Sequence, residues 1–202
     1  MGSGLSRPLT PRTVHLCLDM QNIFAPGGLW ATPWLPKVLP VVEEITRTHP
    51  DRTIFTRFLT PSDPRQVVGL WQDYYRHWEQ ALRGNLPAEA LDLVPSLARF
   101  VPPATVVDKM HYSGFVRSDL NRRLADMKAD ALVVTGAETD VCVLASVLDA
   151  VDLGYRVVVL QDAVCSSSDA GHDALMQVFH GRYSHQIETA GADVVLSAWP
   201  LS

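Results

Sequence analysis

Short apolar runs rich in β-branched residues recur along the chain, and each run stops at a polar residue or a glycine. Runs of this kind are typical of strands that are buried on both faces. Between them lie stretches with helical spacing of apolar residues, several of which open with a capping residue such as Ser118 or Asp169. The predicted strands cover 14–18, 53–55, 105–107, 131–135, 156–160 and 186–189, and the predicted helices cover 35–48, 64–82, 118–127, 140–153 and 169–183.

The alternation of strands and helices predicts an α/β fold in which a mostly parallel sheet is covered by helices on both sides. The chain has 202 residues, a length close to that of one domain, and it contains no stretch that resembles a linker. We expect a flexible N-terminal segment over 1–12 and a single domain over 13–202.

Polar side chains follow four of the predicted strands. Asp19 follows the first strand, Arg57 the second and Lys109 the third, and the segment GAETDVC leads from the fourth strand to Cys142. Ligand sites in parallel sheets lie beyond the carboxyl ends of the strands, so these side chains are expected to converge there. An acid, a base and a thiol at one edge predict a catalytic site.

Cys142 lies two residues into the helix predicted over 140–153. Unpaired backbone N–H groups and the helix dipole at such a position lower the pKa of a thiol, which suits a nucleophile. The alternative is a small buried residue, which is what most free cysteines are. The helix start and the flanking Gly136 and Thr139 favour the nucleophile.

Asp19 and Lys109 have functional and structural interpretations. Asp19 ends an otherwise apolar strand, and as a carboxylate beside Cys142 it would accept the thiol proton and return it to a leaving amine. Its alternative role is a cap on the following loop. Lys109 precedes the polar and aromatic segment HYSGF, so its ammonium is expected in the cleft, where it would stabilise a thiolate; its alternative role is an ordinary surface lysine.

Aromatic residues are concentrated in WQDYYRHW, between Trp71 and Trp78. They fit the core face of a helix, and they equally fit a cover that excludes water from the cleft or an oligomer contact. Arg57 is a candidate for binding a substrate carboxylate or ureido oxygen, because its planar guanidinium matches such groups. A structural salt bridge is the alternative role for Arg57.

Charge and cysteine content exclude several classes. The net charge is −5 and the basic residues are scattered, which argues against a nucleic-acid partner. The three cysteines lack CxxC spacing and the seven histidines form no metal-binding pattern, so we expect neither a disulfide framework, a metal site nor a cofactor. Cys17 and Cys165 are interpreted as inert. The N-terminus has no apolar run, and we expect a cytoplasmic protein that does not contact a membrane.

Three motifs resemble those of the isochorismatase-like cysteine hydrolases, a family that includes nicotinamidases, N-carbamoylsarcosine amidases and ureidoacrylate amidases. The motifs are LDMQNIF with Asp19, KMHYSGF with Lys109 and GAETDVCVLAS with Cys142, and the resemblance covers nearly the whole chain. It implies a three-layer α/β/α fold with about six strands, and an Asp19/Lys109/Cys142 triad. It also implies a cis peptide between Ala137 and Glu138 and an oxyanion hole made by the backbone N–H groups of Glu138 and Cys142.

The implied activity is hydrolysis of a C–N bond through a thioester, in a homo-oligomer of two or four copies that acts on a small molecule. The stretch FTRFLTPSDP lacks the Asp/His/His metal site of nicotinamidases, so a small amide, carbamoyl or ureido compound is favoured over nicotinamide. Two alternatives stay open: an isochorismatase-type vinyl ether hydrolase, in which the cysteine is typically absent, and a non-catalytic binding protein. The candidate substrate-binding residues are Gln21, Phe24, Arg57, Phe58, Trp71, Tyr75, Trp78, His111 and Tyr112.

Overall fold

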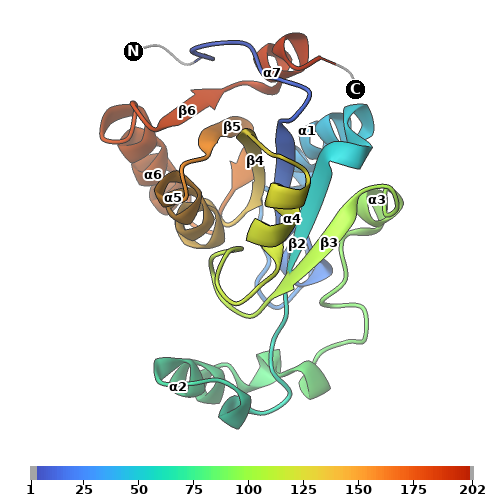
Figure 1. Ribbon diagram of the computed structural model, residues 1–202. Helices are drawn as coiled ribbons and strands as arrows, with labels where there is room; N and C mark the ends of the chain where they lie inside the picture. The colour runs from blue at the N-terminus through green and yellow to red at the C-terminus, as the bar shows by residue number, and fades with distance from the viewer. Residues whose placement is uncertain (1–3, 201–202) are drawn as a thin grey trace.

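The computed structural model describes residues 4–200. Six parallel strands form one sheet in the order β3-β2-β1-β4-β5-β6 (Figure 1). The first strand in the chain, β1, lies inside the sheet. The chain adds β2 and β3 on one side of β1 and β4, β5 and β6 on the other, so the strand order reverses between β1 and β4. The strands are β1 (Val14–Leu18), β2 (Thr53–Phe58), β3 (Thr105–Lys109), β4 (Ala131–Ala137), β5 (Arg156–Cys165) and β6 (Ile187–Ala190).

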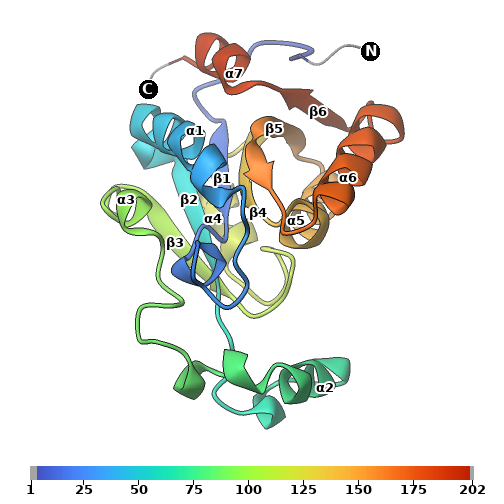
Figure 2. The ribbon, with the colours of Figure 1, turned by 180° about the vertical axis from the view of Figure 1, so that it is seen from behind.

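Helices cover both faces of this sheet, so the predicted three-layer α/β/α fold is confirmed. Within β1, Cys17 faces a core shared with α1, α3 and α7, whereas Leu16 faces a core shared with α4, α5 and α6. Figures 1 and 2 show the two sides. The helices are α1 (Leu35–Thr48), α2 (Leu70–His77), α3 (Pro95–Ala98), α4 (Leu120–Asp126), α5 (Leu144–Asp152), α6 (Asp169–Gly181) and α7 (Ala192–Ala198).

Two predicted helices differ from the structure. The helix predicted over 64–82 is reduced to α2, with short 3-10 turns at Pro64–Gln66 and Glu79–Ala81. Gly69, just before α2, has a φ of 60°, a left-handed conformation that does not continue a helix. The helix predicted over 140–153 opens with a π-helical turn, Thr139–Val143, ahead of α5.

The N-terminal segment expected to be flexible is held against the domain over residues 4–12. The backbone N–H of Gly4 donates to the carbonyl of Thr189 (2.9 Å), and that of Leu9 donates to Ala198 (3.1 Å). The Arg156 guanidinium also donates to two carbonyl groups of this segment. The segment therefore joins β6 and α7, and residues 1–3 lie outside the described part of the chain.

The segment between β2 and β3 projects beyond the carboxyl ends of the strands and carries α2 away from the sheet (Figure 1). Its aromatic side chains consequently lie at the edge where the candidate catalytic residues were expected. Over residues 4–200, none of the helices has the length and apolar character needed to cross a membrane.

Candidate active site

Asp19 and the segment leading to Cys142 follow two neighbouring strands at the point where the strand order reverses. β1 pairs with β4, and Leu18 lies opposite Gly136 in the register of the two strands. Crevices at such switch points are where open α/β sheets bind ligands. The fold thus brings together two residues that are far apart in the sequence.

Gly136 allows β1 and β4 to approach closely just before the site. Its φ is 107°, and a Cβ atom there would lie 2.0 Å from the carbonyl oxygen of Leu18. A residue with a side chain would clash with the backbone of β1, so glycine is required. The peptide bond between Ala137 and Glu138 follows and is cis, as the family resemblance implied.

Asp19 and Lys109 form an ion pair that is completely enclosed. Asp19 Oδ2 lies 2.6 Å from Lys109 Nζ, and both side chains are 0% exposed. Thr56, on the intervening strand β2, donates its hydroxyl to Asp19 Oδ1 at 2.6 Å. Lys109 also donates to the carbonyl oxygens of His111 and Tyr112, each at 3.0 Å. Each charge is therefore paired and hydrogen-bonded, as burial requires.

The Lys109 ammonium stays charged in this enclosure. Burial by itself lowers the pKa of Lys109, whereas the charges of Asp19 and Cys142 raise it. Together the two charges outweigh burial, so the pKa lies above its ordinary value of 10.5. The ammonium also lies 5.0 Å from the centre of the Phe58 ring.

Cys142 is 5% exposed and lies beside this ion pair, at the bottom of a pocket. Burial raises the pKa of its thiol above the ordinary value of 9.0; Lys109 opposes this rise and Asp19 adds to it. The sequence predicted a lowered thiol pKa from the helix start. The structure differs, because loss of hydration outweighs the nearby ammonium and the helix end. The thiol proton therefore needs a base at the moment of reaction.

The pocket above Cys142 has a volume of about 320 Å³. Trp30 lines it and contacts three other lining rings, with its ring centroid 6.0 Å from that of Phe24, 6.1 Å from that of Phe58 and 5.8 Å from that of Trp78. Such centroid separations are typical of packed aromatic pairs. The lining residues are Phe24, Trp30, Phe58, Tyr74, Trp78, Tyr112, Glu138, Val141, Cys142 and Ser167.

Four of the predicted substrate-binding residues line this pocket: Phe24, Phe58, Trp78 and Tyr112. Trp71 does not line it, but packs against Tyr112 in a tilted arrangement with a centroid separation of 4.8 Å.

His111 also lies outside the pocket, in T-shaped contact with Trp71 at 5.9 Å. Tyr75 is fully buried beneath Trp71. These three residues support the wall of the pocket.

Gln21 and Arg57 occupy structural positions away from the pocket. The Gln21 side chain accepts a hydrogen bond from the Phe58 N–H (2.7 Å) and donates to the carbonyl groups of Phe58 and Leu91, which joins the loop after β1 to the end of β2. Arg57 is directed away from the pocket and pairs with Asp108 at 2.8 Å and Asp92 at 3.3 Å. Side chains alternate along a strand, so Arg57 and Phe58 of β2 point to opposite sides.

Four lining groups were not expected from the sequence: Trp30, Val141, Ser167 and the side chain of Glu138. Tyr74 also lines the pocket and comes from the aromatic segment that was one candidate for a cover of the cleft. Trp30 follows a pair of glycines in the loop after β1, and a Cβ atom at Gly28 would lie 2.3 Å from the carbonyl oxygen of Ile23. This tight turn was the available signal that the loop folds back over the site. Within residues 4–200, no three His, Cys, Asp or Glu side chains are grouped as metal ligands would be.

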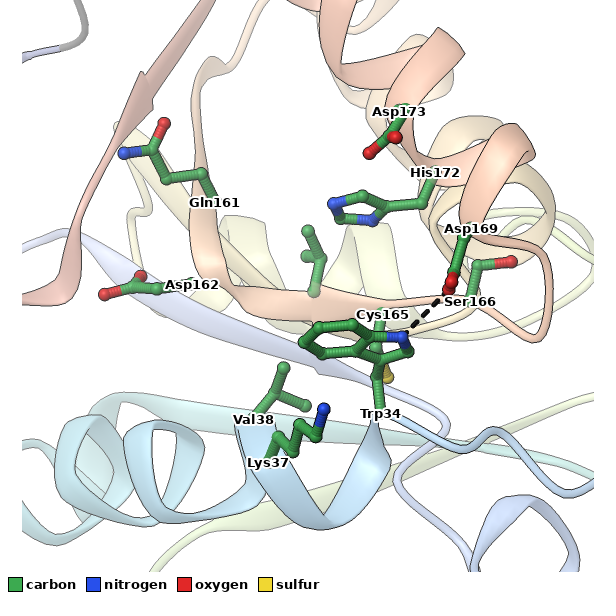
Figure 3. Close-up of a pocket in the computed structure, with 11 residues that line it drawn as sticks. Trp34, Lys37, Val38, Gln161, Asp162, Cys165, Ser166, Asp169, His172 and Asp173 are labelled. Carbon is green, nitrogen blue, oxygen red and sulfur yellow. Dashed lines mark hydrogen bonds between the residues drawn. The ribbon is translucent and has the colours of Figure 1, made fainter.

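A second cavity, of about 440 Å³, lies beside the carboxyl end of β5 and is shown in Figure 3. Two of its three carboxylates have protein donors: Asp169 accepts from the Trp34 indole (2.8 Å) and Asp162 accepts from the Ala192 N–H (3.1 Å), while Asp173 is the third. Cys165 lines it, and burial raises the pKa of that thiol to about 12. None of Asp19, Lys109 and Cys142 lines this cavity.

Comparison with known proteins places the chain in a family. The isochorismatase domain model matches residues 13–191. The uncharacterized isochorismatase family protein PncA of Bacillus subtilis strain 168 is 33% identical over 86 residues, which is 43% of this chain and 47% of that relative. The chain thus aligns with about half of that relative's length. Nicotinamidase of Escherichia coli K12 is 28% identical over 184 residues, with 76% of this chain and 83% of the relative covered.

Solved structures show the same fold. A cysteine hydrolase from Pseudomonas syringae pv. phaseolicola 1448A superposes with a TM-score of 0.82 over 98% of each chain, at 24% identity. Because the domain model matches nearly the whole chain and the fold is shared, the protein belongs to the isochorismatase family.

Proposed function

We propose that the protein is a cysteine-dependent amidohydrolase that cleaves a C–N bond of a small amide, carbamoyl or ureido compound through a thioester. The observation that carries the proposal is the enclosed Asp19–Lys109 ion pair beside Cys142, at the bottom of an aromatic pocket. The relatives named nicotinamidase and N-carbamoylsarcosine amidase support the reaction class.

The first half of the reaction forms the thioester. Asp19 takes the proton of the Cys142 thiol as the sulfur attacks the substrate carbonyl carbon, which forms an S–C bond and places negative charge on the oxygen. A base is needed because burial keeps the thiol protonated. The tetrahedral intermediate then expels ammonia or an amine, which takes the proton from Asp19.

The second half regenerates the enzyme. Asp19 takes a proton from a water molecule as the water oxygen attacks the thioester carbonyl. The S–C bond breaks, the acid product leaves, and the proton on Asp19 returns to the Cys142 sulfur.

Lys109 keeps the two reacting groups in place and stabilises negative charge. Its ammonium is tied to Asp19, His111 and Tyr112, so it is held in one position before substrate binds. A fixed positive charge in a dry site stabilises the thiolate as it forms.

The oxyanion hole is assigned to the backbone N–H groups of Glu138 and Cys142. The backbone N–H of Val141 and that of Val143 donate to the Glu138 carbonyl, at 3.1 and 3.0 Å. These bonds fix the turn that would present the N–H groups of Glu138 and Cys142 to the substrate oxygen. Backbone donors of this kind need no movement as the oxyanion forms.

Ammonia release from small primary amides, carbamoyl and ureido compounds tests the proposal. We expect turnover by the wild type and a loss of at least about a thousandfold in Cys142→Ala. Cys165→Ala is the matched control, since that buried thiol lines the second cavity, and its activity should be retained.

Undiminished release by Cys142→Ala would overturn the thioester mechanism. Hydrolysis of a vinyl ether substrate that survives Cys142→Ala but not Asp19→Asn, with no ammonia release from any amide, would instead indicate the vinyl ether type of reaction. The homo-oligomeric state stays a prediction, which light scattering on the purified protein would test, and the cytoplasmic location likewise stays a prediction.

A further inference from the structure

The wall of the pocket above Cys142 contains aromatic rings and a negatively charged group but no positively charged side chain of the described residues. Six aromatic side chains and one carboxylate, that of Glu138, line it, and no lysine, arginine or histidine of the described chain does so. Aromatic rings carry negative charge on their faces and attract cations. The wall therefore offers negative potential and no balancing positive charge.

The Glu138 carboxylate has a fixed position and spare hydrogen-bonding capacity. Thr32 donates its hydroxyl at 3.3 Å and Ser167 its backbone N–H at 3.2 Å, both to the same oxygen, Oε1. No residue within 4–200 donates a hydrogen bond to Oε2, and Glu138 takes part in no ion pair there. A half-buried carboxylate in a pocket is costly unless a partner compensates it.

The nearby cations are already occupied. The Lys109 ammonium is paired with Asp19 and donates hydrogen bonds to the carbonyl oxygens of His111 and Tyr112. Arg57 is paired with Asp108 and Asp92 outside the pocket. A substrate carboxylate would therefore meet Glu138 and find no free cation.

The titration of Tyr74 is consistent with this potential. Burial raises its pKa, and the charges of Tyr112, Cys142 and Glu138 act in the same direction. Burial also raises the pKa of Tyr112 and the pKa of Cys142, so neither group carries negative charge at neutral pH. The standing negative charge near Tyr74 is the Glu138 carboxylate, which would favour a positive charge in the pocket.

We propose that the pocket selects amides that carry a positive charge close to the scissile carbonyl, and that Glu138 determines this specificity by contacting the cationic group. The substrate class is a small amide of a quaternary or protonated amine, whose alkyl groups lie against the aromatic rings. Amides bearing a carboxylate are excluded. The inference rests on the proposed function, because the reacting amide occupies the same pocket.

Three amides of matched shape test the charge preference. Trimethylammonioacetamide, 3,3-dimethylbutanamide and malonamate carry a positive, a neutral and a negative group at the same distance from the amide. Their binding to the Cys142→Ala protein is measured by calorimetry, so the result does not depend on turnover. We expect the cation to bind at least about tenfold more tightly than the neutral isostere, and malonamate to bind most weakly.

Glu138→Gln is the matched variant, because the amide oxygen of Gln can still accept from Thr32 and Ser167. It should remove most of the cation's advantage, measured as the ratio of its affinity to that of 3,3-dimethylbutanamide in the same variant. Trp30→Leu, which removes an aromatic ring from the wall of the pocket, should also weaken cation binding. Equal affinity for the cation and the neutral isostere, or a preference unaffected by Glu138→Gln, would overturn the inference.

The two proposals fail separately. Charge-selective binding by the Cys142→Ala protein, together with no ammonia release from any amide by the wild type, would contradict the amidohydrolase and leave the charge preference standing. Ammonia release without charge-selective binding would support the amidohydrolase and contradict the charge preference.

Discussion

The carboxylate of Asp19 lies 2.6 Å from the ammonium of Lys109, and neither side chain has any surface in contact with solvent. Lys109 reaches this position from β3, across the width of β2, and Thr56 on β2 donates the second hydrogen bond to the carboxylate. A charge pair of this kind is stable only while both partners and their hydrogen bonds are present. The site is consequently assembled before substrate enters.

Lys109→Met should destabilise the protein strongly, because it leaves the Asp19 carboxylate buried without its partner. We expect the free energy of unfolding in urea to fall by about 3 to 5 kcal/mol. The double variant Asp19→Asn/Lys109→Met should regain part of this loss, since no buried charge remains. Lys128→Met, at an exposed position, is the control and should change stability by less than about 0.5 kcal/mol. Similar losses in both lysine variants would contradict the account.

Alkylation of Cys142 by iodoacetamide should accelerate with pH beyond the range in which ordinary thiols level off. Only the thiolate reacts, and burial raises the pKa of this thiol above 9.0, so the protonated form persists to higher pH. The rate at Cys142, followed by peptide mapping, should still be rising at about pH 9.5, where a thiol with the ordinary pKa of 9.0 is already mostly ionised. A plateau below about pH 8 would mean that Cys142 is a thiolate at rest.

Gly136→Ala should disrupt the site, because its Cβ would lie 2.0 Å from the Leu18 carbonyl oxygen on the adjacent strand. We expect a loss of more than about 1 kcal/mol in unfolding free energy, together with a loss of ammonia release. Gly84→Ala is the matched control, since nothing lies within 4 Å of a Cβ there. If Gly136→Ala is as stable and active as Gly84→Ala, the close approach of β1 and β4 is not needed.

Substitution of Trp30 should raise KM, whereas substitution of Arg57 should not. Trp30→Ala removes a ring from the wall of the pocket and should raise KM by about tenfold or more, with a smaller effect on kcat. Arg57→Met removes ion pairs with Asp108 and Asp92 outside the pocket and should leave KM unchanged. Steady-state kinetics on one amide would distinguish them. A large KM increase in Arg57→Met would return that residue to substrate binding.

The fold was predictable from the sequence because parallel strands buried on both faces leave a strong pattern. The runs at Val14–Leu18 and Ala131–Ala137 are apolar almost throughout, and both strands lie in the middle of the sheet. The polar residues after the carboxyl ends of these two strands identified Asp19 and Cys142 as candidate catalytic residues. The short α3 and α7 were missed, since helices of a few residues leave little periodicity.

The pocket walls were less predictable, because they depend on loops whose paths no local pattern specifies. Trp30 reaches the site through a turn in the loop after β1, and Arg57 is directed away from it by alternation along β2. Glu138 was assigned a backbone role only, although its side chain also lines the pocket. The sign of the thiol pKa shift was likewise missed, because it depends on how deeply Cys142 is buried.

The most direct test of the account is to look for the acyl group on Cys142 during turnover. The amide that releases ammonia fastest is mixed with the wild type, the reaction is quenched in acid, and the peptides are mapped by mass spectrometry. The account predicts a single acyl thioester, on the Cys142 peptide, that is absent from Cys142→Ala. Continued ammonia release with no acyl group on Cys142, or with the acyl group on Cys17 or Cys165, would contradict it.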